Sequence, residues 1–404
     1  MWDGIIIGSG LSGLIAGIRA VDNGKRVLMI SEGISSLGSA AGVFNFGDLA
    51  QLQGKLKHPY SLFDKMTIRQ GFDYFLNLCP QYIGEWGRTN TVLTPLGTER
   101  KAELVPRRFR ADLLESAKRL ILIAPQGLKD FFPEVIKGNL QKNFPYGEVL
   151  IKPIQVDKFK PWYELGKSIL GNNYAKFWCT EDGVASLQKI FQEISDNIDK
   201  GAGQSAEETV VIFPSIAAEF YKPLEDMFVQ APFSVIELMA FPPSTMGLTL
   251  YDALKRKFQS MGGEMLRNSR VSRCELEQGE CRSVVVNSRG KEVSFAAKTF
   301  VIASGGILGG GIQGTPQGVR EMVADLPLFI PQTLTGAEFL DHQPYALIGA
   351  EVNSELRPID PATGAVLFNN VMVVGRMLGH WDPWQDGCGG GVSITSGYFA
   401  GTKI

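Results

Sequence analysis

Apolar residues occur along this chain in short continuous runs that are separated by segments with helical spacing. The first two runs cover residues 5–7 and 26–30, and both are rich in the branched residues typical of a buried strand. Between them, small apolar residues recur over residues 14–20 with the spacing of a helix that packs on a sheet. The pattern therefore predicts a strand, a turn, a helix and a second strand over residues 2–32.

The turn of this unit is rich in glycine, and each glycine has a separate expected role. Gly8 allows the tight turn, Gly10 lets backbone N–H groups approach a pyrophosphate, and Gly13 brings the helix close to the strand. A pyrophosphate bound there would lie at the positive end of the helix dipole. A glycine-rich turn alone is a weak signal, but the strand before it and the helix after it favour dinucleotide binding over a purely structural turn.

A carboxylate, Glu32, follows the second strand at the place where it can reach the ribose hydroxyls of an adenosine. The pattern does not distinguish NAD from FAD. The residues predicted to bind the dinucleotide are Gly8, Ser9, Gly10, Leu11, Ser12, Gly13, Ser31, Glu32 and Gly33.

The next segment, residues 33–42, consists almost entirely of small residues and carries no charge. In flavoproteins of the dinucleotide-binding kind, the chain at this place runs beside the flavin phosphate and ring. A flexible loop is the alternative, which the length and lack of charge disfavour. The residues predicted to line the flavin here are Ser39, Ala40, Ala41 and Gly42.

From about residue 55 to residue 243 the chain is richer in prolines and aromatic residues and alternates strand-like with helical pieces. This alternation predicts a second sheet with covering helices. We expect an inserted α/β domain over residues 55–243 that contacts the substrate or a partner. The predicted strands cover residues 120–124, 149–156, 210–213 and 235–239, and the predicted helices include residues 64–82 and 184–198.

After the insertion, the nucleotide-binding domain is expected to resume. An apolar run over residues 299–304 ends at small residues, where backbone can again pass close to the dinucleotide, so Ala303, Ser304 and Gly305 are predicted to contact it. The predicted fold is a doubly wound parallel sheet of Rossmann type with a small antiparallel hairpin sheet, built from residues 1–54 and 244–404. Other elements expected here are a helix over residues 248–261 and strands over 264–266, 271–277, 283–287 and 293–296.

The C-terminal segment adds a second glycine-rich start of a helix, after a buried strand over residues 371–374. A helix start with several free N–H groups favours the negative charge that a reduced isoalloxazine carries. NAD-dependent dehydrogenases have no need of this return of the chain to the first sheet, so a flavin is preferred to NAD. The residues predicted to contact the flavin are Gly375, Arg376, Cys388, Gly389, Gly390, Gly391 and Val392.

Composition narrows the class of protein. A net charge of −2 over 404 residues gives no electrostatic footprint for nucleic acid or for an anionic membrane surface. The 5 cysteines are scattered without a CxxC pair, which argues against a disulfide framework, a metal site and an iron–sulfur cluster held by this chain alone. Because no apolar run reaches the roughly 18 residues that span a bilayer, we expect a cytoplasmic protein without a transmembrane segment.

With these motifs in order from end to end, the chain resembles the family of B subunits of anaerobic glycerol-3-phosphate dehydrogenases, within the fumarate-reductase-like flavoproteins. The resemblance is weak between residues 110 and 230. It implies a cytoplasmic flavin subunit, peripheral to the inner membrane, that works with an FAD-containing catalytic subunit and an iron–sulfur membrane-anchoring subunit. Electrons would pass from glycerol 3-phosphate to quinone. The stretches that carry the resemblance are residues 8–13, 58–62, 94–98, 303–306, 356–358, 382–383 and 387–391.

The chain departs from this pattern in three places. Flavoproteins often have Gly-Asp where this chain has Gly375-Arg376, so a guanidinium could lie near the flavin phosphate or ring. If it stabilised the reduced anion by ~1–2 kcal/mol, the two-electron potential would rise by roughly 20–40 mV. The family is usually described with FMN, whereas Glu32 favours FAD, so FAD is preferred and FMN stays the alternative. Trp381 and Trp384 could stack on the flavin or a partner, with core packing as the alternative.

Few residues suit acid–base catalysis. His380 precedes the flavin-facing helix and could exchange a proton with a substrate hydroxyl, because histidine titrates near neutrality. A structural role is the alternative for His380 and more so for His58 and His342. Cys388 at a helix start would have a lowered pKa if exposed, but a small residue that fits beside the ring explains it equally well.

Three functional hypotheses therefore stand side by side. The first is a flavin-dependent oxidoreductase subunit that oxidises glycerol 3-phosphate. Its phosphate contacts could come from a cationic cluster, for which a solvated face or a subunit contact is the alternative: Arg100, Lys101, Arg107, Arg108 and Arg110. The second is a flavoprotein that only relays electrons or scaffolds the complex. The third is a reductase of the fumarate type acting on another acid.

Overall fold

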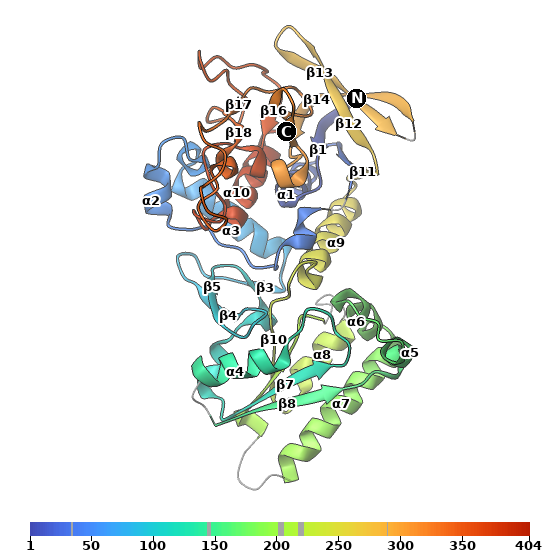
Figure 1. Cartoon of the computed structure of the whole chain (residues 1–404). Helices are drawn as coiled ribbons and strands as arrows, with labels where there is room; N and C mark the ends of the chain where they lie inside the picture. Colours follow the sequence, from blue (N-terminus) through green and yellow to red (C-terminus); the bar gives the residue numbers. More distant parts are fainter. Residues whose placement is uncertain (34, 144–146, 201–205, 217–221, 289) are drawn as a thin grey trace. The chain divides into compact units, whose positions relative to one another are not determined.

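The computed structural model describes residues 1–33, 35–143, 147–200, 206–216, 222–288 and 290–404 (Figure 1). The chain forms two compact units. The first unit contains Met1–Ser36, Phe44–Cys79 and Tyr251–Ile404, and the second contains Leu37–Val43 and Pro80–Leu250.

The first unit is built on a 7-stranded sheet. Its parallel part has the order β11-β2-β1-β14-β19, and an antiparallel hairpin, β12-β13, extends from β14. This is the predicted fold class, a parallel sheet with a small hairpin sheet. The strands are β1 (Trp2–Ile7), β2 (Val27–Ser31), β11 (Glu264–Arg267), β12 (Arg270–Glu277), β13 (Glu280–Ser288), β14 (Lys291–Ile302) and β19 (Val371–Val373).

Continuous apolar runs form the centre of this sheet because its strands are covered on both faces. In β1, Ile5 and Ile6 are fully buried although their side chains point to opposite faces. The two strands predicted at residues 293–296 and 299–304 are a single strand, β14. Its first part is largely exposed and pairs with β13, and its last part is buried between β1 and β19. Because the environment changes within this strand, its sequence has two hydrophobic patterns, which predicted two strands.

Helix α1 (Leu11–Asp22) covers β1 and β2, and the same unit contains the helices α10 (Gly389–Lys403) and α3 (Lys65–Leu78). The last helix, α10, packs against both α1 and α3 (Figure 1). Glycines allow the approach, since a Cβ added at Gly397 would overlap the carbonyl oxygen of Ser12, and one at Gly401 would lie 2.6 Å from that of Ala16. The contact moves from Ser12 to Ala16 along α1 as it moves from Gly397 to Gly401 along α10, so the two helices run in the same direction.

Smaller elements complete the first unit. Helix α3 was predicted over residues 64–82 but ends at Leu78, before Pro80, and the Asp64 side chain caps its start by accepting a hydrogen bond from the N–H of Thr67 at 2.7 Å. The remaining elements are α2 (Leu49–Gly54), η2 (Pro59–Leu62), η7 (Ile307–Gly309), β15 (Ile312–Thr315), β16 (Gly318–Glu321), β17 (Leu328–Phe329), η8 (Pro344–Leu347), β18 (Gly349–Ala350) and η9 (Gly375–Met377).

The second unit contains a 4-stranded parallel sheet of order β10-β9-β7-β8, as the alternation of strands and helices predicted. In β7, Leu120 and Leu122 face one apolar core with α4, whereas Ile121 and Ile123 face the other with α6, α7 and α8. The elements are β7 (Arg119–Pro125), α4 (Pro133–Asn143), β8 (Glu148–Ile154), α6 (Gly171–Trp178), α7 (Glu181–Lys200), β9 (Thr209–Phe213), α8 (Lys222–Gln230) and β10 (Ser234–Glu237).

Short connecting elements follow this sheet or precede it. Helix α9 (Thr245–Ser260) carries the chain from the second unit to the first. The others in the second unit are β3 (Tyr82–Ile83), β4 (Asn90–Leu93), β5 (Glu99–Ala102), β6 (Val105–Pro106), η3 (Arg107–Phe109), η4 (Asp112–Ser116), η5 (Asp157–Phe159), α5 (Lys160–Glu164) and η6 (Ala206–Glu208).

The boundaries of the units differ from the expected ones. Residues 55–79, expected in the insertion, belong to the first unit, where α3 packs against α10. Residues 37–43, expected in the nucleotide-binding domain, belong to the second unit. The role of the second unit as a substrate or partner-contact domain stays a prediction.

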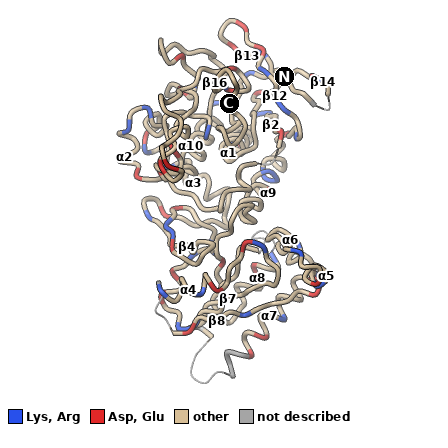
Figure 2. Tube along the Cα trace, viewed as in Figure 1, with Lys and Arg blue, Asp and Glu red and all other residues tan. Residues whose placement is uncertain are grey.

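Charge is mixed along both units. Figure 2 shows lysines and arginines interspersed with aspartates and glutamates, which agrees with the net charge of −2. Among the described residues, no helix has the length and apolar character needed to cross a bilayer.

Candidate functional site

The predicted dinucleotide residues gather at one edge of the first sheet. Parallel strands β1, β14 and β19 are neighbours, so the segments that follow them leave from the same edge. The chain first moves from β1 to β2 and later enters β14 on the other side of β1. Ligands of open α/β sheets bind in the crevice at such a reversal of strand order.

The glycines of the β1–α1 turn have the packing that the sequence predicted. Gly8 has φ +111°, and a Cβ there would overlap the carbonyl oxygen of Ala303, just beyond β14. A Cβ at Gly13 would overlap the carbonyl oxygen of Gly8. A Cβ at Gly10 would meet no heavy atom within 4 Å. The turn is therefore closed toward the sheet and open at Gly10.

The opening at Gly10 lies at the start of α1. Gly10 is the N-cap residue, and no side chain caps this helix end. The first N–H groups of a helix have no partner within the helix, and the helix dipole makes this end positive. A phosphate group fits this arrangement.

The segment after β19 joins the same site. Gly375 has φ +66°, and a Cβ there would overlap the Ser12 hydroxyl in the first turn of α1. The N–H of Gly375 donates to the Ser396 hydroxyl of α10 at 3.0 Å. The structure thus brings the N-terminal turn, the end of β19 and the last helix together.

Two polar groups at this edge are buried and have no hydrogen-bond partner among the described residues. They are the hydroxyl of Ser304, which follows β14, and Nη1 of Arg376, which follows β19. Buried polar groups are nearly always satisfied in native proteins, and a bound ligand is one way to satisfy them. The open space at Gly10 and these two groups fit a bound flavin nucleotide.

The glycine-rich start of α10 is more tightly packed than the sequence suggested. A Cβ at Gly390 would lie 2.5 Å from the Cβ of Phe44, and one at Gly391 would overlap the Tyr60 hydroxyl. The N–H of Gly391 donates to the carbonyl oxygen of Asn45 at 2.9 Å. Of the several free N–H groups expected at this helix start, that of Gly391 is engaged, because residues 44–46 cover this side of the helix. The flavin contacts of this segment stay predictions. Cys388, Gly389 and Val392 lie in the same segment.

The end of β2 carries the predicted carboxylate on the surface. Ser31 is buried, whereas the Glu32 side chain is 64% exposed and its Oε1 lies 3.8 Å from Nη1 of Arg270. A Cβ at Gly33 would meet no heavy atom within 4 Å, and Ile34 lies outside the described residues. Glu32 is therefore accessible to an adenosine ribose, and this contact stays a prediction.

Residues 37–43 are described with the second unit. There the N–H of Ser244 donates to the carbonyl oxygen of Gly38 at 2.7 Å, and the Tyr82 hydroxyl donates to that of Gly42 at 2.7 Å. The predicted flavin contacts of this loop remain predictions. They are Ser39, Ala40, Ala41 and Gly42.

His380 lies in a network of side chains that sequence reasoning missed. Its Nε2 is 2.9 Å from Oε1 of Glu351, and Nζ of Lys57 is 2.8 Å from Oε2 of the same carboxylate. Its ring stacks on Phe329 with centroids 3.9 Å apart. Burial acts to raise the pKa of Glu351, but the hydrogen bonds from Lys57 and His380 hold it below the ordinary value. The carboxylate is thus ionised and fixes the imidazole. No local sequence signal pairs residues so far apart.

His58 is buried and neutral. Its Nδ1 accepts a hydrogen bond from the N–H of Tyr60 at 3.1 Å, so Nε2 carries the proton of the neutral ring. Nε2 lies 3.7 Å from both Sγ of Cys388 and Oδ2 of Asp386. Burial lowers the pKa of His58 to about 4, which the charge of Asp386 only partly offsets. This is a structural histidine at the start of α10.

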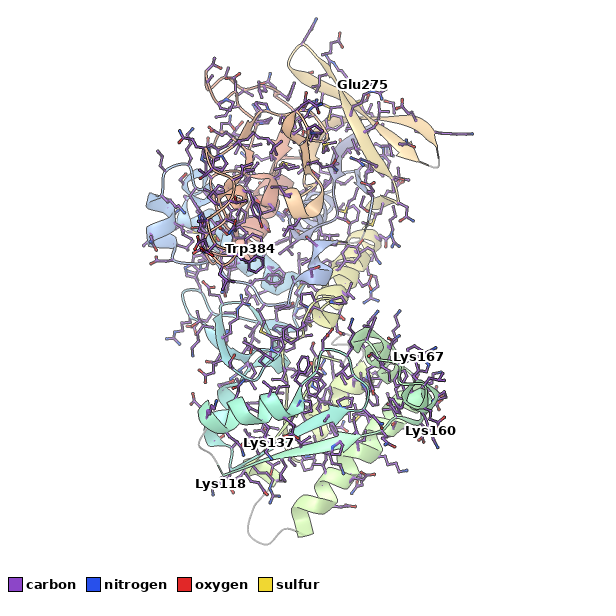
Figure 3. All side chains as sticks on the ribbon, viewed as in Figure 1. Lys118, Lys137, Lys160, Lys167, Glu275 and Trp384 are labelled. Carbon is purple, nitrogen blue, oxygen red and sulfur yellow. The ribbon has the colours of Figure 1, made fainter. Side chains whose placement is uncertain are left out.

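The two tryptophans of the linker differ in environment. Trp381 is buried, and its indole N–H donates to the carbonyl oxygen of Leu378 at 2.8 Å, which fits the core-packing alternative. Trp384, labelled in Figure 3, is 62% exposed. Exposure leaves Trp384 free to contact a ligand or a partner.

Two arginines of the cationic cluster in the second unit lie beside carboxylates. Arg108 lies 3.6 Å from the buried carboxylate of Glu237, and Arg110 pairs with Asp112. With their charges met by carboxylates, these arginines offer little to an anionic substrate.

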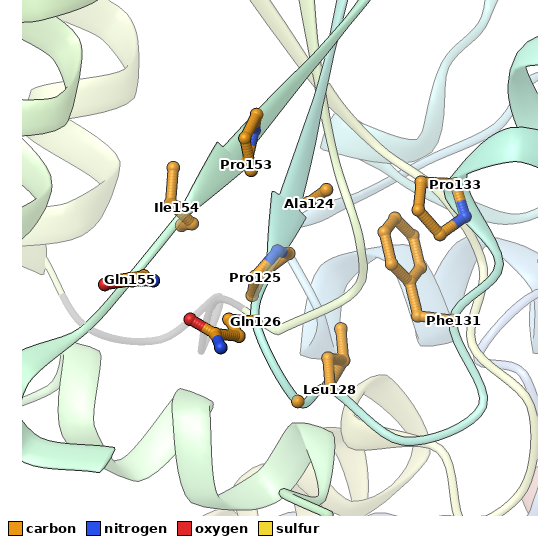
Figure 4. Close-up of a pocket in the computed structure, with 10 residues that line it drawn as sticks. Ala124, Pro125, Gln126, Leu128, Phe131, Pro133, Pro153, Ile154 and Gln155 are labelled. Atoms are coloured by element: carbon orange, nitrogen blue, oxygen red, sulfur yellow. The ribbon is translucent and has the colours of Figure 1, made fainter. Parts of the chain in front are cut away.

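The second unit has a cavity of its own at the carboxyl edge of β7 and β8. Its volume is about 400 Å³, and Figure 4 shows apolar side chains around it. The next strand after β7, β8, lies on one side of β7, and the one after that, β9, lies on the other, so the strand order reverses at β7. In open sheets small molecules bind in the crevice at such a reversal, and the cavity lies at this place. Lining residues include Gln126, Leu128, Phe131, Pro153, Ile154 and Gln155.

Known relatives of this chain are B subunits of anaerobic glycerol-3-phosphate dehydrogenases. Over 100% of its length the chain is 27% identical to the B subunit of this enzyme from Yersinia enterocolitica, of which it covers 98%. It is 24% identical over 98% of its length to the B subunit from Vibrio vulnificus, of which it covers 94%. These relatives agree with the resemblance seen in the motifs.

Solved structures are more distant. The 3-ketosteroid-delta4-(5alpha)-dehydrogenase of Rhodococcus jostii RHA1 is 11% identical, with a TM-score of 0.37 over 99% of this chain and 96% of that one. THI4 of Thermovibrio ammonificans is 10% identical, with a TM-score of 0.37 over 100% of this chain and 88% of that one.

The family model described as "FAD binding domain" matches residues 3–142 and 230–392. The match covers both segments that build the first sheet and confirms FAD as the predicted cofactor. Since it extends over well more than half of the chain, the chain belongs to the FAD binding domain family.

Proposed function

We propose that this protein is the FAD-bearing B subunit of a glycerol-3-phosphate dehydrogenase complex. The observation that carries the proposal is similarity over the whole chain, since 100% of it aligns with 98% of a B-subunit relative. The convergence of the β1–α1 turn, the end of β19 and α10 supports a flavin site in the same chain. Its partners would be an FAD-containing catalytic subunit and an iron–sulfur subunit that anchors the complex to the inner membrane and passes electrons to quinone.

Oxidation of glycerol 3-phosphate to dihydroxyacetone phosphate removes two electrons and two protons from a secondary alcohol. When bound, FAD supplies the two-electron oxidation. The protein's residues must hold the substrate and take the hydroxyl proton. We assign this proton to His380, because Glu351 holds its Nε2–H at 2.9 Å and leaves Nδ1 as the basic nitrogen.

Substitution of Glu351 tests this assignment. Glu351→Gln keeps the shape but removes the carboxylate that fixes the imidazole of His380, so kcat should fall. His380→Asn should lower kcat by about 100-fold or more, the usual contribution of general-base catalysis. His342→Asn is a matched control, since His342 is partly exposed and pairs with Asp382 at 3.2 Å. A His380→Asn variant with unchanged kcat would contradict the assignment.

An electron relay without substrate chemistry is the second candidate. The small number of acid–base residues favours it, because the chain has only 3 histidines and one of them, His58, is buried and neutral. Titration of the isolated FAD-loaded subunit with glycerol 3-phosphate separates the two candidates. Bleaching of the flavin absorption would support catalysis in this subunit, whereas bleaching only in the complete complex would support a relay. A fumarate-type reductase has less support, because Arg108 and Arg110 are occupied by carboxylates.

The second unit is proposed to contribute a small-molecule or partner site. Its cavity at the edge of β7 and β8 supports a small molecule. Leu128→Arg would fill the cavity and should raise KM for a substrate that binds there. Leu113→Arg, on a partly exposed residue of the same unit, is the control. Equal KM values for both variants and the wild type would leave the partner-contact role as the better proposal.

A further inference from the structure

Arg376 has an unusual environment for an arginine. It lies in η9, directly after β19, and most of its side chain is buried. Nη2 donates to the carbonyl oxygen of Ala346, while Nη1 is buried without a hydrogen-bond partner among the described residues. Its Cζ lies 5.5 Å from the centroid of the Trp381 ring. The guanidinium thus keeps one donor group for something that the described chain does not supply.

The positive charge of Arg376 is also not matched by a close carboxylate. Within the described ranges, Arg376 has no ion pair closer than 4 Å. Burial lowers the pKa of Arg376, and Asp382 is the acid that acts to raise it. Both oxygens of Asp382 are already engaged, Oδ1 by the N–H of Trp384 at 2.9 Å and Oδ2 by His342 at 3.2 Å. Because a buried charge without a partner is costly, an anion is expected beside Arg376.

The stem of Arg376 follows the backbone that leaves β14. A Cβ at Gly306 would lie 3.1 Å from Cγ and 3.7 Å from Cζ of Arg376. The residue before Arg376, Gly375, touches Ser12 in the first turn of α1. Ser304, with its own unpartnered hydroxyl, precedes Gly306 by two positions. Arg376 therefore belongs to the edge of the sheet at which the nucleotide is proposed to bind.

We propose that Nη1 of Arg376 binds the phosphate of the flavin nucleotide and makes the site select phosphorylated flavins over riboflavin. This inference rests on the proposed FAD site. Guanidinium groups bind phosphate through charge-assisted hydrogen bonds, and a phosphate keeps its charge whether the flavin is oxidised or reduced.

Flavin titrations of the full-length apoprotein test this inference. Riboflavin, FMN and FAD are titrated into wild type, Arg376→Gln and Arg376→Lys, and binding is followed by flavin fluorescence. Arg376→Gln should weaken FMN and FAD binding about 10- to 100-fold and leave riboflavin unchanged. Arg376→Lys, which keeps the charge but not the fork, should fall between. Arg282→Gln is the control, because Arg282 is 54% exposed and pairs with Glu280 on the hairpin.

Other results would overturn the inference in distinguishable ways. Equal weakening of riboflavin and FMN would mean that Arg376 shapes the ring site or the fold, which thermal unfolding of the variant would also reveal. Unchanged flavin binding with weaker glycerol 3-phosphate, but not glycerol, binding to the FAD-loaded protein would place a substrate phosphate at Arg376 instead. If the wild type bound none of the three flavins, the proposed function itself would fail. Wild-type binding with an unchanged Arg376→Gln variant would refute only the role of Arg376.

Discussion

The contrast between Gly10 and Gly13 gives the sharpest prediction for the proposed nucleotide site. At Gly10, φ is −70° and an added Cβ would meet no heavy atom within 4 Å. Gly10→Ala should therefore change the free energy of unfolding of the apoprotein by about 1 kcal/mol or less, the scale of a change at an N-cap. At Gly13 the added Cβ would overlap the backbone oxygen of Gly8. Gly13→Ala should cost about 1–3 kcal/mol, as overpacking usually does.

Although Gly10→Ala should change the stability of the apoprotein little, it should weaken FAD binding strongly. The methyl group of Gly10→Ala would occupy the space expected for the pyrophosphate. Loss of a charge-assisted hydrogen bond costs about 1.5–3 kcal/mol, which corresponds to an affinity about 10- to 100-fold weaker. Urea unfolding of the apoprotein and titration with FAD measure the two quantities separately. Gly54→Ala in α2, where an added Cβ also meets no heavy atom within 4 Å, is the control and should change neither quantity strongly.

A fully stable Gly10→Ala variant that binds FAD like the wild type would refute the reasoning. The space beside Gly10 would then be a feature of the turn and not the place of a ligand. A Gly13→Ala variant as stable as the wild type would show instead that the turn can yield, and would contradict the packing role of Gly13.

Three further predictions concern other parts of the first unit. Glu32→Ala should weaken FAD but not FMN in equilibrium titrations, because only FAD has the adenosine ribose; equal effects on both would contradict a ribose contact. The pKa of His58 is about 4 in the folded protein, against an ordinary value of 6.5. The stability that the neutral ring contributes above pH 6.5 is therefore lost as the pH falls toward 4. The loss is about 3 kcal/mol, at about 1.36 kcal/mol per pKa unit. In urea unfolding across this range, His58→Asn should have a smaller loss than the wild type, and an identical loss would contradict a buried neutral ring. Gly397→Val should lower the free energy of unfolding by about 1–3 kcal/mol or more, because its side chain would overlap Ser12; unchanged unfolding would contradict the close packing of α1 and α10.

The part of the fold that depends on local pattern was predictable from the sequence. The unit from β1 to β2 follows from two apolar runs, a glycine turn and small residues at helical spacing, and all of these lie within residues 2–32. The four parallel strands of the second sheet were also predicted from short apolar runs. Such a run arises because alternating residues of a strand such as β7 face two different apolar cores. Local periodicity is sufficient where each element has one environment along its length.

Features that depend on long-range contacts were not predictable. β14 crosses from an exposed hairpin to a buried parallel pairing, so one strand has two hydrophobic patterns. Residues 37–43 follow β2 in sequence but pack against the start of α9. The unpartnered donor of Arg376 is visible only when the surrounding backbone is known.

The structure brings together some of the residues predicted to form the site, and their contacts with a nucleotide stay predictions. Sequence reasoning found the glycines of the β1–α1 turn and the end of β19, which the structure brings together through Gly375 and Ser12. It missed Glu351 and Lys57 beside His380, because these residues meet only through the tertiary fold.

The identity of the cofactor released from the purified protein tests the central claim most directly. Full-length protein saturated with FAD is separated from free flavin, its visible spectrum is recorded, and the small molecule released by denaturation is weighed by mass spectrometry. The convergence of the β1–α1 turn with α10 predicts a yellow protein that retains FAD and releases it intact. A well-folded protein that stays colourless after exposure to FAD would contradict the account.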